Sequence, residues 1–100
     1  MKAIAEQEYR DDYGDYIMLS LFYKDENHYM VEKVVFPKAE GQEERISTVD
    51  VWFSNPLNRV ADFTGGIKID GQTRIPEDIA EFLTSNGLRV DKEKFCYPKR

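Results

Sequence analysis

The chain has 100 residues and a net charge of −5, from 19 acidic and 14 basic side chains. This length fits one domain with a single core and excludes a separate cofactor-binding domain. Hydrophobic residues make up 41% of the chain and charged residues 33%, so the chain has enough apolar material to fold on its own.

The acidic excess lies entirely in the first half of the sequence. Residues 1–50 hold 12 acids and 6 bases, whereas residues 51–100 hold 7 acids and 8 bases. A negative surface repels phosphate groups, which argues against direct binding of nucleic acid or of anionic lipid. The same electrostatic field would attract a protein partner with a basic surface.

The composition also bears on the compartment. Cys96 is the only cysteine, so the chain has no internal disulfide, as is usual in a reducing compartment. The first ten residues lack the apolar core of a signal peptide, and the longest apolar runs are much shorter than a membrane span. We therefore expect a cytoplasmic protein with no membrane contact.

The first half of the chain is predicted to form four strands, at residues 2–9, 16–23, 29–36 and 46–53. The second is apolar on both sides, which favours a place at the centre of the sheet. It is joined to the third by a polar turn at 24–28, and Pro37 ends the third strand. In the fourth strand, the residues expected to be buried are Ser47, Val49, Val51 and Phe53, with Trp52 on the opposite side.

The second half has helical and turn signals. Residues 54–66 predict about two turns of helix, because Leu57, Val60 and Ala61 recur at helical spacing before Gly65 and Gly66. The pair Asp70-Gly71 predicts a tight hairpin.

A second helix is predicted over residues 75–88. Pro76 opens it, and Ile79, Phe82 and Leu83 form its buried side. Gly87 follows where a left-handed cap is expected. The remaining residues, 88–100, predict a short strand or a docked tail.

Strands followed by helices predict an α+β fold in a single domain, residues 1–100. We expect an antiparallel meander of about four strands with one short and one longer helix packed on one face. The other face of such a sheet can remain exposed to water. In a meander, the loops at 10–15 and 37–45 emerge at one end of the sheet, and the turn at 24–28 emerges at the other.

No motif in the sequence names a reaction. His28 and Cys96 could form a base and a nucleophile, but a turn histidine in solvent and a buried or tail cysteine explain them better, because nothing in the sequence places the two together. The three aspartates at 11, 12 and 15 lack the EF-hand spacing and fit a turn in which they bond their own backbone. The glycines in 64–71 lack the spacing of a phosphate-binding loop. We predict no catalytic residue, no metal and no cofactor.

Aromatic side chains on the strands allow a second interpretation. Rings that face outward could stack on nucleic-acid bases, and the candidates are Phe22, Tyr23, Tyr29, Phe36, Trp52 and Phe53. The same rings could instead form the core. The acidic charge of this half of the chain argues against base stacking as their role.

The segment EYRDDYGDY, residues 8–16, interleaves tyrosines with carboxylates. Tyrosine is enriched at protein interfaces, and carboxylates beside it can bind arginine. The predicted partner-binding residues are Tyr9, Asp11, Asp12, Tyr13, Asp15, Tyr16, Glu40, Glu43 and Glu44. A solubilising acidic surface explains the same residues.

We predict a non-enzymatic protein-binding domain. Its size and charge would suit a small acidic inhibitor, of the phage anti-defence or immunity type, that mimics DNA and covers a basic nucleic-acid-binding surface of a larger protein. The alternatives are a small nucleic-acid-binding module and a structural subunit of a larger assembly.

Overall fold

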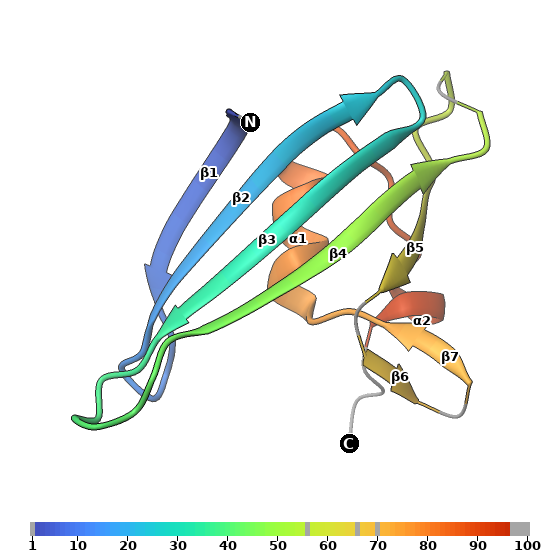
Figure 1. The fold of residues 1–100 in the computed structure, drawn as a ribbon. Helices are drawn as coiled ribbons and strands as arrows, with labels where there is room; N and C mark the ends of the chain where they lie inside the picture. The colour runs from blue at the N-terminus through green and yellow to red at the C-terminus, as the bar shows by residue number, and fades with distance from the viewer. Residues whose placement is uncertain (1, 56, 66, 70, 97–100) are drawn as a thin grey trace.

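The computed structural model of the chain describes residues 2–55, 57–65, 67–69 and 71–96. Its main element is an antiparallel sheet of five strands, each paired with its neighbour in the sequence (Figure 1). These strands are β1 (Ala3–Arg10), β2 (Tyr16–Asp25), β3 (His28–Phe36), β4 (Arg45–Phe53) and β5 (Ala61–Gly65). The α+β meander is confirmed, with five strands in place of about four.

One face of the sheet is covered by helix α1 (Glu77–Ser85), which lies behind it in Figure 1. In β2 to β5, alternate residues point toward this layer and are buried, as Val49, Val51 and Phe53 are in β4, whereas β1 has no fully buried residue. Ser47, predicted on the same side, is exposed. The core also includes Ile17, Leu19, Leu21, Val31, Phe63, Ile75, Ile79, Phe82, Leu83 and Phe95. The strand order is β1-β2-β3-β4-β5, so β3 is the central strand and β2 lies second. The predicted place of β2 at the centre of the sheet is wrong.

The segment predicted as a short helix is instead a turn followed by β5. Asn55 begins a single turn, in which its side chain accepts from the N–H of Leu57 at 3.0 Å. Arg59 then adopts a positive φ of 52°, which ends the turn. Beyond it, Ala61 and Phe63 are buried and their neighbours exposed, a period of two that specifies a strand. The helical prediction for this segment is wrong.

The predicted hairpin is present as β6 (Ile67–Ile69) paired with β7 (Gln72–Arg74). Asp70, the first residue of the predicted Asp70-Gly71 turn, lies outside the described residues. A short helix, α2 (Lys92–Phe95), follows near the end of the described chain. The tail is docked, because Phe95 is buried and its carbonyl accepts from the N–H of Ile75 at 2.8 Å. Within residues 88–96 the alternative of a final strand is wrong, and residues 97–100 of the predicted segment lie outside the described residues.

The longer helix is confirmed. Pro76 occupies its N-cap position, and Glu77 and Asp78 place negative charge in the first turn, where the helix dipole favours it. Gly87 adopts a φ of +83°, and the N–H of Leu88 donates to the carbonyl of Leu83. Both features are typical of a left-handed C-terminal cap. None of the helices in the described ranges is long and apolar enough to cross a membrane.

The two edges of the sheet differ. The first residue of β5, Ala61, donates its N–H to the carbonyl of Arg89 at 2.8 Å, so that edge is partly covered. Strand β1 pairs only with β2, and within the described residues its outer edge has no neighbouring strand. A register shift between Ala3 and Ala5 interrupts the start of β1, so its regular edge runs from Ala5 to Arg10.

Candidate functional site

The loops at 11–15 and 37–44 lie at the same end of the sheet, as the meander predicts (Figure 1). They are joined directly, because the backbone N–H of Lys38 donates to the carboxylate of Asp15 at 2.9 Å. The turn between β2 and β3 lies at the opposite end. We call residues 10–15 and 37–45 the loop end.

Asp11 organises the first of these loops. Its carboxylate accepts from the N–H of Tyr13 at 3.0 Å and from the N–H of Asp15 at 2.9 Å, and its backbone bonds both Gly14 and Asp15. This is the turn chemistry in which an aspartate bonds its own backbone. Gly14 has a φ of +86°, a conformation that glycine adopts without steric cost. The oxygens of Asp11 and Asp15 are therefore partly used within the molecule.

The remaining acids of the loop end face solvent. Asp12, Glu40, Glu43 and Glu44 are exposed, and the Tyr13 side chain is 86% exposed. The loop end holds six acidic side chains, against the basic Arg10, Lys38 and Arg45, which gives a net charge of −3. The predicted loop residues are thus brought together on an acidic, accessible end of the molecule.

Tyr9 leaves this group and points to the helix layer. Its hydroxyl donates to the carboxylate of Asp78, which also forms an ion pair with Lys33 at 2.8 Å. Partial burial, together with the bond to Asp78, raises the pKa of Tyr9 above its ordinary value. The chain therefore uses Tyr9 to join strand β1 to helix α1, on the side of the sheet away from Tyr16, and its role in binding a partner stays a prediction.

Tyr16 points to the face of the sheet opposite α1, which we call the open face. Its ring packs against Phe36 with centroids 5.9 Å apart, and the guanidinium of Arg10 lies 5.6 Å from the ring centroid. Its hydroxyl donates to Glu8, and this hydrogen bond raises the pKa of Tyr16. Tyr9 and Tyr16 thus lie on opposite faces of the sheet.

No described helix or strand covers the open face of the sheet (Figure 1). Next to the loop end, the strand register places five apolar side chains together: Tyr16, Met18, Val34, Phe36 and Ile46. Ile46 is 60% exposed and Phe36 38% exposed, whereas Tyr16 and Met18 are partly exposed and Val34 is buried beneath them. We call these five residues the apolar patch. A group of apolar side chains that is partly open to solvent is typical of an interaction site.

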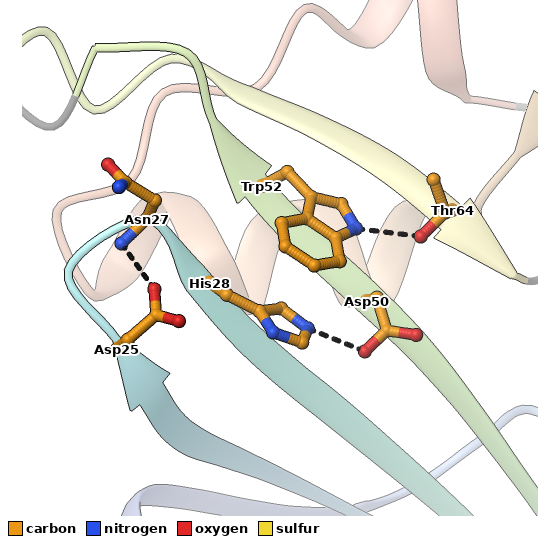
Figure 2. A network of polar contacts seen from close by, with 6 residues as sticks. All are labelled: Asp25, Asn27, His28, Asp50, Trp52 and Thr64. Carbon is orange, nitrogen blue, oxygen red and sulfur yellow. Dashed lines mark hydrogen bonds and ion pairs between the residues drawn. The ribbon is translucent and has the colours of Figure 1, made fainter.

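Beyond a polar row formed by Ser20, Glu32 and Thr48, a second aromatic group lies on the open face (Figure 2). His28 stacks on Trp52 with centroids 3.7 Å apart and ring planes 9° from parallel. The Nε2 atom of His28 lies 2.8 Å from the carboxylate of Asp50. The indole N–H of Trp52 donates to Thr64 at 2.7 Å.

Sequence reasoning missed this cluster. It placed His28 in a solvated turn, whereas His28 is the first residue of β3 and its side chain is only 18% exposed. The signal that could have found it is the register, because His28 pairs with Trp52 directly. Trp52 lies on the face opposite the core, as predicted. Of the other aromatic rings considered for stacking, Tyr29 and Phe53 are buried.

The pairing of His28 with Cys96 is not realised. Cys96 packs against the core on the helix side of the sheet, and partial burial raises the pKa of its thiol above its ordinary value. His28 lies on the open face. The structure therefore separates the two groups by the thickness of the sheet, which rules out the nucleophile and base arrangement.

An acidic groove lies between β1 and the first turns of α1. It has a volume of about 520 Å³ and is lined by Gln7, Tyr9, Glu77, Asp78 and Glu81. Lys33 neutralises Asp78, and Lys92 approaches Glu81 at 3.9 Å. Glu77 and Glu81 are exposed. The groove presents carboxylate oxygens beside the free edge of the sheet.

In the part of the chain that the structure describes, no three histidine, cysteine or acidic side chains are grouped closely enough to hold a metal ion. The strand register adds five acidic side chains on the open face to the six of the loop end, namely Glu6, Glu8, Glu32, Asp50 and Asp62. Comparison with protein-family models, with curated proteins and with solved structures finds no match for this chain.

Proposed function

We propose that this chain is a non-enzymatic protein-binding domain that docks its open face and loop end on a basic surface of a larger protein. The observation that carries this proposal is the exposed apolar patch, which lies directly beside the acidic loop end. Apolar contact supplies affinity, and the surrounding charges steer the encounter and select the partner.

The charge distribution supports a cationic partner over a second copy of the chain. Two open faces in contact would bring together two surfaces that are each acidic, which costs free energy through like-charge repulsion. A basic surface would instead be attracted at long range, and its arginines could bind the exposed carboxylates of Asp12 and Glu44 in bidentate geometry.

A more specific form of the proposal is inhibition. Basic protein surfaces often bind nucleic acid, and a rigid acidic surface can occupy the place of the phosphates. We propose that the chain blocks such a surface, as a DNA mimic would. The alternative of a nucleic-acid-binding module is supported by the aromatic rings on the open face, and it is opposed by the negative charge around them.

The proposal is tested with two matched double variants. Phe36→Ser/Ile46→Ser removes the two most exposed side chains of the apolar patch. Leu57→Ser/Val60→Ser removes two apolar side chains that are 91% and 45% exposed but lie outside the patch. Proteins captured from cell extract by the wild-type chain are identified by mass spectrometry, purified, and titrated with each variant in calorimetry.

The captured partner should have a basic surface, and its affinity should fall as salt is raised. The patch variant should lose at least about tenfold in affinity, as expected for interface-centre residues, while the control variant keeps wild-type affinity. If the partner is first loaded with an oligonucleotide, addition of the chain should displace that oligonucleotide. Equal affinity of the two variants, or affinity insensitive to salt, contradicts the proposal. Oligonucleotide binding by the chain alone would favour the nucleic-acid-binding alternative.

A further inference from the structure

The outer edge of β1 is a second surface suited to a ligand. From Ala5 to Arg10 the strand is regular and pairs only with β2. Every second residue of such an edge strand directs its backbone N–H and C=O away from the sheet, where they can bond an added strand. The edge therefore offers a template about six residues long, which is a common length for a strand.

Acidic side chains border this edge on both faces of the sheet. On the helix side lies the groove of about 520 Å³, with Glu77 and Glu81 exposed along it. On the open face lie Glu6 and Glu8, both exposed. Among the cations nearby, Lys33 pairs with Asp78, Lys92 lies 3.9 Å from Glu81, and Arg10 donates to the carbonyl of Gly14.

We propose that β1 binds an extended segment rich in lysine or arginine as a sixth strand of the sheet. Side chains of an added strand alternate between the two faces. One set would enter the groove toward Glu77 and Glu81, and the other would lie beside Glu6 and Glu8. Backbone hydrogen bonds supply affinity in this mode, and the flanking carboxylates supply selectivity for basic side chains.

The same charges exclude a second copy of β1 as the occupant. Two β1 strands paired edge to edge would bring Glu6 and Glu8 of one copy close to the same residues of the other, and like charges across a strand pair are destabilising. Charged edge residues commonly prevent self-association of this kind. A basic strand is attracted by the charges that repel a copy of the chain.

This inference concerns a different surface from the apolar patch, although both require a basic partner, as the proposed function does. The probe is an eight-residue peptide that alternates lysine with threonine or valine, titrated into the full chain. The matched probe carries N-methyl groups on alternate backbone nitrogens, so that it keeps the charge and side chains but cannot donate along one edge. A third peptide replaces lysine with glutamate.

The lysine peptide should bind, and hydrogen exchange should show new protection confined to amides of β1. The N-methylated and glutamate peptides should not bind. Glu77→Gln/Glu81→Gln should weaken binding on the order of tenfold, and Glu26→Gln/Glu93→Gln, which removes two acids elsewhere, should leave it unchanged. Equal binding of the N-methylated peptide, or protection outside β1, overturns the proposal.

The two surfaces can be separated with the patch variant. Phe36→Ser/Ile46→Ser should bind the lysine peptide with wild-type affinity, because neither residue is in β1 or the groove. If the patch fails its own test while the peptide still protects β1, the edge proposal stands alone. If the chain instead self-associates through β1 in size-exclusion chromatography, the edge proposal is wrong.

Discussion

His28 and Trp52 occupy directly opposed positions on β3 and β4, and their rings stack at 3.7 Å between centroids. Each ring is also held by its own hydrogen bond, His28 to Asp50 and Trp52 to Thr64. The cluster therefore has two independent constraints on ring orientation. It fixes the only tryptophan of the chain in a partly exposed position on the open face.

The emission of Trp52 should report this stacking. His28→Ala removes the ring that covers one face of the indole, so quenching of its fluorescence by acrylamide should increase. His28→Phe keeps an aromatic ring in place and should leave quenching close to wild type, although it loses the bond to Asp50. If acrylamide quenches Trp52 in His28→Ala no more than in wild type, the imidazole does not shield Trp52.

Tyr9→Phe should give a pH-dependent loss of stability. Near neutral pH the variant loses the bond to Asp78, and the free energy of unfolding should fall by about 1 kcal/mol. Because the pKa of Tyr9 is raised in the folded state, its contribution is fully present below its unfolded pKa of about 10 and declines as pH rises above that value. The gap between wild type and variant should therefore narrow above about pH 10.

Denaturant unfolding at about pH 7 and about pH 10.5 measures this gap. Tyr13→Phe is the control, since the Tyr13 side chain is 86% exposed, and it should match wild type at both pH values. A constant gap for Tyr9→Phe would contradict the role of the buried hydroxyl.

Asp15→Ala should release the loop at 37–44 from the loop at 11–15. The variant loses the acceptor for the N–H of Lys38, and we expect a stability loss of about 1 kcal/mol together with faster exchange of the Lys38 amide. Asp15→Asn keeps an acceptor oxygen and removes the charge, so its amide exchange should stay near wild type. Fast exchange in both variants would assign the effect to charge and not to the hydrogen bond.

A comparison of Gly14→Ala with Gly41→Ala separates two causes of lost stability, the strain of a positive φ and the steric contact of the added Cβ. Both glycines have positive φ, at 86° and 82°, so each substitution should cost about 1 kcal/mol from conformation alone. A Cβ at Gly14 would also lie 2.8 Å from Cδ of Lys38, whereas nothing lies within 4 Å at Gly41. Gly14→Ala should therefore destabilise more in thermal unfolding. Equal losses at the two positions would show that the flexible end of the Lys38 side chain moves aside without cost.

Much of the fold followed from local sequence pattern. The four predicted strands and the longer helix depend on periodicity and on turn residues, and Ile79, Phe82 and Leu83 are buried as expected. The error at residues 54–66 arose because Val60 and Ala61 fit helical spacing. The alternation of Ala61 with Phe63 specifies a strand, but only the vacant edge of β4 makes that strand favourable, and this is a tertiary effect.

The site was less predictable for a related reason. Placement of the two acidic loops at one end follows from strand direction alone and is confirmed by the bond between Lys38 and Asp15. The bond from Tyr9 to Asp78 joins residues 69 positions apart, so no local pattern could reveal it. The His28 cluster needed the exact pairing of β3 with β4, which a turn of different length would shift by one residue and turn to the other face.

The unequal edges of the sheet limit how this molecule can assemble. Arg89 bonds the start of β5 and partly covers that edge, so addition of a further strand to the five-stranded sheet is favoured at β1. A filament needs two complementary growing ends on every subunit, and among the described strands of the five-stranded sheet β1 is the edge without such cover. Complexes formed along the sheet should therefore stop at a fixed stoichiometry, with one strand taken up by each molecule.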